Sequence, residues 1–278
     1  MVKWSASVKP LRTRDAGRSD DAMPKLIVVM PAYNESERIV SVLNQVAPYV
    51  DAFVLIDDAS KDNTVELMKT WREQHPAMYL IGLSQNVGAS GALKAGYIFV
   101  RHLLETGAIA PDDLIVEMDA DGQHDPQYIP RLKQPFLEGW SVDVVLARRD
   151  FSNYPRYKRY GNLALTLIAS CLSGFHYHDV ESNFRVSRAD VFPRLLEYFS
   201  GYRYSGAFEV GIILACLKYR VQNDITVQVP FYREGARAVD GLHVLAMGLK
   251  AWGKVRLGLR NPDLPGMTES VLRRLSEN

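Results

Sequence analysis

Four short apolar runs, separated by segments with helical periodicity, constrain the fold of this chain more than any other feature. Each run has the continuous hydrophobicity of a strand buried on both faces of a sheet, and the runs are 25–30, 52–56, 78–83 and 114–118. Helical patterns lie between them, at 39–46, 64–71 and 89–104. This alternation predicts an α/β fold with a doubly wound, mostly parallel sheet and helices on both of its faces.

The second half of the chain is less regular. Its predicted elements are a strand, a basic and aromatic loop, three helices, a strand and an amphipathic helix, at 143–147, 148–160, 162–172, 186–199, 208–218, 226–231 and 242–259. We predict a flexible extension over 1–23, one α/β domain over 24–240, and an amphipathic C-terminal helix with a tail over 241–278.

Composition excludes several classes of protein. Of the 278 residues, 47% are hydrophobic, enough for a sizeable core, and the formal net charge of +1 does not support general polyanion binding. No run approaches the ~20 apolar residues that cross a bilayer, and the polar residues 1–23 lack the apolar stretch of a signal peptide. Cys171 and Cys216 lie in apolar runs, so we expect buried, reduced thiols in a cytoplasmic protein.

Two acidic pairs directly follow predicted strands, and such sheets bind ligands beyond the carboxyl ends of their strands. Asp119 and Asp121 follow the fourth strand, and Gln123 adds a neutral oxygen. Adjacent carboxylates repel unless a cation lies between them, so a Mg²⁺ or Mn²⁺ ion on a diphosphate fits this spacing. A solvated acidic loop, or Asp119 as a helix cap, is the simpler alternative.

Asp57 and Asp58 form the second acidic pair. An acidic residue at the end of the second strand commonly accepts hydrogen bonds from a ribose or a base, although one of the two could cap the next helix. The sequence after the first strand is PAYNE, at 31–35, and not Gly-x-Gly-x-x-Gly. This argues against a dinucleotide-binding fold, and the lack of a Walker A motif argues against a P-loop nucleotidase.

Four ordered motifs resemble those of the family 2 glycosyltransferases, which have the GT-A fold. They are VMPAYNE at 29–35, IDDASKDNT at 56–64, NVG at 86–88 and MDADGQH at 118–124. Asp-Ala-Asp followed by Gln at the second position is typical of the dolichol- and polyprenyl-phosphate sugar synthases. RYGN at 159–162 and DVESNFR at 179–185 resemble acceptor-side segments of the same subgroup, so the resemblance places the C-terminal helical region on the acceptor side.

The resemblance implies a role for each matching residue. The nucleotide pocket would contain Pro31, Tyr33, Glu35, Asp57, Asp58 and Asp119. The metal ligands would be Asp119, Asp121 and Gln123. Catalysis would depend on Asp121, Arg149 and Arg159, with Arg149 on a phosphate. The acceptor side would include Arg156, Asp179, Ser182, Arg185 and Glu209.

Two residues depart from the family pattern. Ala59 stands where the family has glycine, which we interpret as a mild change. Asn183 also replaces a glycine, which we interpret as the more important change. Asparagine tolerates a left-handed backbone, so the turn can survive, but we expect contacts with the acceptor to differ there.

The chemistry of the acceptor separates two possibilities. A hydroxyl acceptor requires a general base, and Glu181 and Glu209 are the candidates on the acceptor side. A lipid phosphate is already anionic and needs arginine to orient it. The basic and aromatic segment 148–159 favours the lipid phosphate, although it could instead grip only the donor diphosphate. Nucleic acid as a partner would leave the acidic strand ends unexplained.

Other features leave alternatives open. We interpret His124, His176 and His178 as ordinary polar residues. The C-terminal helix could lie on an anionic membrane or pack on the core. The segment 233–235 is expected to close over the site, as its counterpart does in the family.

We therefore predict an inverting, metal-dependent glycosyltransferase. It would move a sugar from a GDP- or UDP-sugar to polyprenyl or dolichyl phosphate, as a peripheral protein on the cytoplasmic face of a membrane or with a small membrane partner. The alternative is transfer to a hydroxyl of a saccharide or glycolipid in surface polysaccharide synthesis. A sugar-nucleotide nucleotidyltransferase is a further alternative, but it would need a Gly-rich loop with Arg and Lys, which 31–37 lacks.

Overall fold

A seven-stranded sheet forms the centre of the computed structural model, which describes residues 23–230 and 238–261. Its strands lie in the order β3-β2-β1-β4-β7-β5-β8; they are β1 (Leu26–Ala32), β2 (Ala52–Asp57), β3 (Met78–Gly82), β4 (Leu114–Glu117), β5 (Val144–Leu146), β7 (Arg185–Arg188) and β8 (Val221–Gln222). β7 runs antiparallel to both neighbours, and the other pairs are parallel. β6 (Arg148–Arg149) and β9 (Thr226–Val227) form a separate parallel pair.

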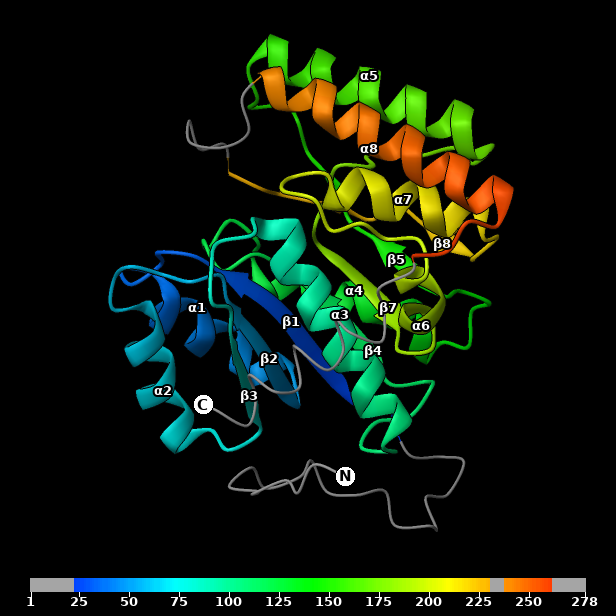
Figure 1. Ribbon diagram of the computed structural model, residues 1–278. Coiled ribbons are helices and arrows are strands. Elements are labelled where there is room, and N and C mark those ends of the chain that lie inside the picture. The colour runs from blue at the N-terminus through cyan, green and yellow to red at the C-terminus, as the bar shows by residue number, and fades with distance from the viewer. Residues whose placement is uncertain (1–22, 231–237, 262–278) are drawn as a thin grey trace.

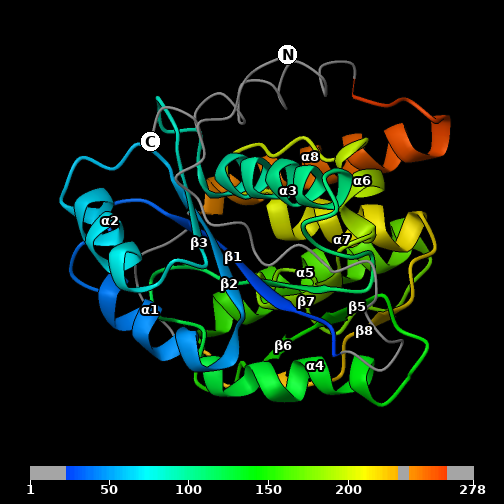
Figure 2. The ribbon, with the colours of Figure 1, turned by 90° about the horizontal axis from the view of Figure 1, so that it is seen from below.

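Helices cover both faces of the sheet because alternate residues of each strand point to opposite sides. Leu26, Val28 and Met30 of β1 pack with α1 (Ile39–Val46), α2 (Thr64–Gln74) and α4 (Ile129–Leu137). Ile27 and Val29 pack with α3 (Ala89–Glu105), α6 (Val191–Leu196) and α7 (Gly206–Cys216). Figure 2 shows these two helical layers on either side of the sheet. Short 3₁₀ turns, η1 (Ala47–Tyr49) and η2 (Pro126–Tyr128), complete the connections.

Two long helices form an outer layer over α7 (Figure 1): α5 (Arg156–Ser173) and α8 (Ala238–Leu257). α8 packs closely on α7. At Gly248 of α8 there is no room for a side chain, since an added Cβ would come within 2.2 Å of the Phe208 ring of α7. The Trp252 indole Nε1 donates to the Leu172 carbonyl at 2.7 Å. The C-terminal helix therefore packs on the core. Among the described helices, none is long and apolar enough to cross a membrane.

Several predictions for the second half were wrong. Residues 186–199 are not one helix, because Val186 lies in β7 between Val116 of β4 and Val145 of β5, and α6 begins only at Val191. A short buried strand and a buried helix segment have the same apolar pattern, so periodicity alone does not separate them. The last strand is limited to Thr226–Val227, and β8 was not predicted because a strand of two residues has no detectable alternation.

The segment 148–160 is also not simply a loop. Its first two residues form β6, and α5 begins at Arg156, directly after Pro155. The prediction of buried cysteines was wrong as well, since Cys171 is exposed and Cys216 is partly buried. Cys171 lies on α5, whose apolar run faces solvent along one side.

Candidate active site

The carboxyl ends of β1, β2 and β4 lie side by side, with β1 in the middle. In register, Ala32 at the end of β1 pairs with Asp57 of β2, and Val29 pairs with Glu117 at the end of β4. The loops that follow these three strands therefore leave the same edge of the sheet. The structure thus brings both acidic pairs to one place.

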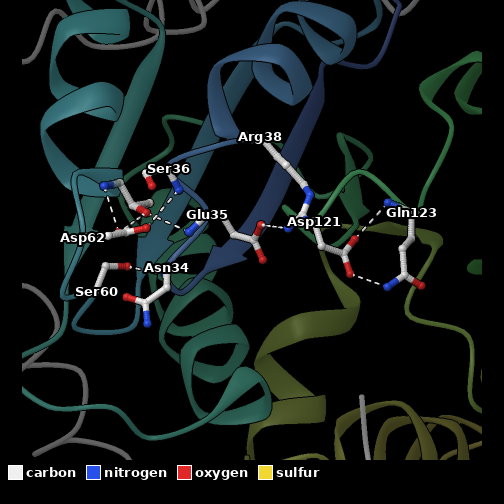
Figure 3. Close-up of polar contacts among 9 residues, drawn as sticks. Asn34, Glu35, Ser36, Arg38, Ser60, Asp62, Asp121 and Gln123 are labelled. Atoms are coloured by element: carbon white, nitrogen blue, oxygen red, sulfur yellow. Dashed lines mark hydrogen bonds and ion pairs between the residues drawn. The ribbon is translucent and has the colours of Figure 1, made fainter. Parts of the chain in front are cut away.

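Hydrogen bonds fasten the loop after β1 to the loop after β2 (Figure 3). Asn34 has a left-handed backbone, with φ of 57°, which asparagine tolerates better than most residues. Its N–H donates to Ser60 Oγ at 2.9 Å, and its Oδ1 accepts from the Lys61 N–H at 2.8 Å. The Glu35 N–H donates to Thr64 Oγ1 at 2.8 Å. These bonds fix the backbone that carries Glu35.

Glu35 lies close to Asp121, one of the predicted metal ligands. Its carboxylate accepts from Arg38 Nη1 at 3.4 Å. Burial raises the pKa of Glu35 against the hydrogen bond from Arg38, and the charge of Asp121 raises it further. Arg38 was not among the predicted site residues, because a basic residue directly before a helix carries no distinctive sequence signal.

The other predicted nucleotide residues differ in what they contact. Both oxygens of Asp58 are engaged, by the N–H groups of Val87 and Gly88 at 2.8 Å each. Asp58 therefore holds the turn that begins α3. Among the described residues, the Asp57 carboxylate accepts only from the Ser60 N–H, at 3.2 and 3.3 Å, and it keeps acceptor capacity for a ligand. Pro31 is paired with Ile56 inside the sheet, whereas Tyr33 is exposed at its edge.

Asp119 is held by two residues from different loops, one after β4 and one before β7. Its N–H donates to His124 Nδ1 at 3.1 Å, and Asn183 Nδ2 donates to its Oδ2 at 3.4 Å. Because His124 Nδ1 accepts, the ring proton is on Nε2, which lies 4.0 Å from the same Oδ2. Burial lowers the pKa of His124 to about 4, so the ring is neutral. His124 also stacks on Phe184, and its role is to position Asp119.

Asp121 is held by its neighbour Gln123. The Gln123 N–H donates to Oδ1 at 2.9 Å, and Gln123 Nε2 donates to Oδ2 at 2.7 Å (Figure 3). Burial raises the pKa of Asp121, and the charge of Asp119 raises it further. A cation between the carboxylates would remove this repulsion, so the donor set fits Mg²⁺ or Mn²⁺.

Such an ion would draw most of its ligands from outside the protein. Within residues 23–230 and 238–261, no group of three or more His, Cys, Asp or Glu side chains is arranged to hold a metal. Phosphate and water would supply the remaining oxygens, as is usual for Mg²⁺ with nucleotides.

An arginine-rich cleft of about 640 Å³ lies between β6, β9 and α5. Its lining includes four arginines, a histidine and apolar side chains: Arg148, Arg149, Arg156, Arg159, His178, Phe151, Tyr160 and Leu163. The structure thus brings the predicted residues Arg149, Arg156 and Arg159 together. The cleft lies next to the segment that carries Asp119 and His124. The charge of Arg149 acts on both of these residues.

Arg149 is oriented by a carboxylate behind it. Its Nε and Nη2 donate to the two oxygens of Asp179 at 2.7 and 2.8 Å, and Nη2 also donates to Asn162 Oδ1 at 2.9 Å. The paired charge raises the pKa of Arg149 despite burial. Asp179, expected on the acceptor side, is fully buried and positions Arg149.

Three other residues expected on the acceptor side lie in the core. Arg185 Nε donates to Glu117 Oε2 at 2.7 Å, where the Tyr97 hydroxyl also donates. Ser182 is fully buried. Glu209 accepts from the Ser200 N–H and Oγ at 2.6 and 2.7 Å, so its carboxylate serves the core and not the cleft. The segment 233–235 lies outside the described residues.

At the two positions that depart from the family pattern, the backbone differs from what we predicted. Asn183 does not have a positive φ, so its backbone does not require glycine. Ala59 has φ of 60°, in the left-handed region that favours glycine. The interpretation of Ala59 as a mild change was therefore wrong for the backbone.

Residues 27–204 match the family described as glycosyl transferase family 2. The chain belongs to this family. It is 33% identical over 207 residues to the UDP-N-acetylglucosamine–dolichyl-phosphate N-acetylglucosaminyltransferase of Methanococcus voltae, covering 68% of this chain and 80% of the relative. It is 30% identical over 175 residues to the undecaprenyl-phosphate mannosyltransferase of Micrococcus luteus, covering 60% and 68%. The predicted resemblance is confirmed, and the protein is a glycosyltransferase. The alternative of a sugar-nucleotide nucleotidyltransferase was therefore wrong.

The solved structures confirm the GT-A fold. Glucosyl-3-phosphoglycerate synthase of Mycobacterium tuberculosis, in complex with Mn²⁺, UDP-glucose and phosphoglyceric acid, superposes with a TM-score of 0.58 at 20% identity. The alignment covers 83% of this chain and 80% of that enzyme.

Proposed function

We propose that this family 2 glycosyltransferase transfers a sugar, with inversion, from a UDP- or GDP-sugar to polyprenyl or dolichyl phosphate, using Mg²⁺ or Mn²⁺. The observation that carries the proposal is the arginine cleft beside the acidic edge of the sheet, by which we mean Asp57, Asp119 and Asp121. The acidic edge suits a metal-bound diphosphate, and four arginines beside it suit a second phosphate group. The two relatives named for dolichyl-phosphate and undecaprenyl-phosphate support the same acceptor class.

In the proposed reaction, the arginine cleft binds the acceptor phosphate and the acidic edge binds the leaving diphosphate. The lipid phosphate oxygen forms a bond to the anomeric carbon of the sugar as the bond from that carbon to the nucleoside diphosphate breaks. The phosphate is already anionic, so no residue has to remove a proton from it. Arg149, preoriented by Asp179, matches phosphate geometry and would hold the nucleophile in line. A divalent ion at Asp119 and Asp121 would stabilise the charge on the leaving diphosphate.

We further propose that the outer face of α5 contacts the membrane. Tyr157, Tyr160, Leu163 and Leu167 lie on one helical face and are 68%, 68%, 52% and 54% exposed. Tyr160 and Leu163 also line the arginine cleft, so the apolar face is continuous with the proposed phosphate site. Arg156, Lys158 and Arg159 at the start of α5 would suit anionic headgroups. A lipid held in the bilayer could then present its phosphate to the cleft.

The test is a donor and acceptor screen with purified protein. UDP- and GDP-sugars are combined with a polyprenyl phosphate in vesicles, with free polyprenol and with saccharide acceptors. We expect metal-dependent transfer to the polyprenyl phosphate alone, abolished by Asp121→Ala and reduced at least 100-fold by Arg149→Lys. Arg260→Lys, at an exposed arginine paired with Glu197, is the matched control and should be active. Transfer only to a hydroxyl would reject the lipid-phosphate acceptor and leave the family assignment standing.

A further inference from the structure

Glu181 stands beside the Arg149–Asp179 pair and takes no part in the mechanism described above. Its N–H donates to Asp179 Oδ1 at 3.2 Å, the same oxygen that accepts from Arg149 Nη2 at 2.8 Å. Its carboxyl oxygen Oε1 is buried and has no hydrogen-bond partner among the described residues. An ionised carboxylate with an unsatisfied buried oxygen is costly, and a neutral carboxyl costs much less.

We propose that Glu181 is a positioning residue that couples binding of the acceptor phosphate to the uptake of one proton. The inference rests on the proposed phosphate acceptor and adds the means by which the site adjusts its charge. Arg149 and Asp179 together carry no net charge. An ionised Glu181 therefore makes the three-residue cluster negative, whereas a protonated Glu181 leaves it neutral and allows Arg149 to face an anion.

The surrounding charges agree with this role. Glu181 interacts electrostatically with Arg149 of β6 and with Asp179 of its own loop. Tyr154, before α5, interacts with the same two residues. The other charged or titratable side chains that line the cleft beside Arg149 are Arg148, Asp150, Arg156, Arg159, Tyr160 and His178, so the cations outnumber the one carboxylate. Burial raises the pKa of Glu181 to about 7 against the charge of Arg149, and Asp179 adds to the increase. The carboxyl therefore changes its charge in the physiological range.

The coupling has a definite sign. A phosphate that binds the neutral cluster more tightly must raise the proton affinity of Glu181, because linkage is reciprocal. Below pH 7 the group is already neutral, so binding takes up little proton. Above pH 7 each binding event has to protonate it, and the acceptor KM should increase by at most about tenfold per pH unit.

The experiment uses farnesyl phosphate, a short polyprenyl phosphate, with the full chain and its Glu181→Gln variant. The glutamine keeps the shape and the neutral charge. We expect the acceptor KM of the wild type to rise between pH 7 and 8.5 relative to that of the variant, with similar values near pH 6 and little change in kcat. The comparison cancels the titration of farnesyl phosphate itself. Calorimetry in two buffers of different ionisation enthalpy should show proton uptake at pH 8 by the wild type and less by the variant.

Each other outcome overturns the inference in a recognisable way. Parallel pH profiles and equal proton uptake would show that Glu181 does not titrate with binding. A collapse of kcat in Glu181→Gln at every pH would instead show that Glu181 acts in the chemical step and not through phosphate binding. If the variant fails to fold, an absence of proton uptake by the wild type alone at pH 8 is enough to reject the coupling. Absence of both farnesyl phosphate binding and lipid transfer in the wild type would reject the proposed function as well, whereas transfer without proton uptake would reject only the coupling.

Discussion

Ala59 shows how a single residue at this site departs from its preferred conformation. Its φ of 60° costs an L-residue with a Cβ roughly 1–2 kcal/mol. It lies between Asp58 and Ser60, which fasten the neighbouring loops. We predict that Ala59→Gly increases the free energy of unfolding by about 1 kcal/mol, because the relieved strain exceeds the added entropy of the unfolded chain. The melting temperature should rise by about 2–4 °C.

A matched substitution elsewhere should have the opposite sign. Ala164 is an exposed residue in the interior of α5. Ala164→Gly should lower the free energy of unfolding by about 1 kcal/mol, because glycine is a poor helix former. Urea unfolding of the two variants beside the wild type measures both effects. A loss of stability in Ala59→Gly would show that the left-handed backbone is not strained.

At the residue scale, the sequence predicted the groups that follow strands and missed the groups that orient them. Asp57, Asp119 and Asp121 lie in ordered motifs directly after apolar runs, so their meeting at one edge follows from the parallel topology. The positioning of Asp119 by His124 and Asn183 depends on contacts between β4 and the segment before β7, which no local pattern encodes. The same holds for the pairing of Arg149 with Asp179, 30 residues apart.

At the scale of elements, α5 combines a wall of the arginine cleft with an exposed apolar face. We predict that the double change Leu163→Glu and Leu167→Glu abolishes sedimentation with anionic vesicles, since it places charge where apolar side chains would enter the bilayer. The melting temperature should change little because both side chains are exposed. Leu242→Glu with Leu257→Glu on α8 is the matched control, again at two exposed leucines. Loss of binding in the α8 variant and not in the α5 variant would place the membrane contact on the C-terminal helix.

β8 is an edge strand of two residues, and a charged pair holds it next to β5. The Asp143 carboxylate accepts from the backbone N–H and Nε of Arg220 at 2.8 and 2.9 Å, and also from Nη2. These hydrogen bonds lower the pKa of Asp143 against the effect of burial. A carboxyl with a lowered folded-state pKa stabilises the fold above its unfolded pKa, and this contribution is lost as pH falls through the folded value.

Asp143→Asn should therefore destabilise the protein at neutral pH and do so less in acid. We expect a loss of about 1 kcal/mol at pH 7, a modest value because Arg220 is largely exposed. The difference between wild type and variant should become smaller below pH 4. Chemical unfolding at pH 7 and at pH 3.5 measures both values. An equal difference at the two pH values would show that the ionised pair does not support β8.

At the scale of the whole molecule, the two halves were predictable to different degrees. The first four strands and three helices follow one another along the chain, so local periodicity is sufficient to order them. The second half depends on β7, which enters the sheet antiparallel between β4 and β5. Its residues pair with residues of β4 about 70 positions away and with residues of β5 about 40 positions away. The walls of the arginine cleft come from β6, β9 and α5, which lie apart in the sequence, so its arginines were predicted while its walls were not.

Binding of a nucleotide and a metal should be visible in the stability of the whole molecule, because ligands that bind only the folded state stabilise it by mass action. At 100 times the dissociation constant the gain is about 2.7 kcal/mol, or several degrees in melting temperature. We expect UDP or GDP with Mn²⁺ to produce this shift, and EDTA to remove most of it, because Asp119 and Asp121 repel a diphosphate without a cation. Asp121→Asn should lose the dependence on Mn²⁺. Arg149→Gln should keep it, since Arg149 is assigned to the acceptor phosphate. An undiminished nucleotide shift in EDTA would show that the acidic edge binds its donor without a metal.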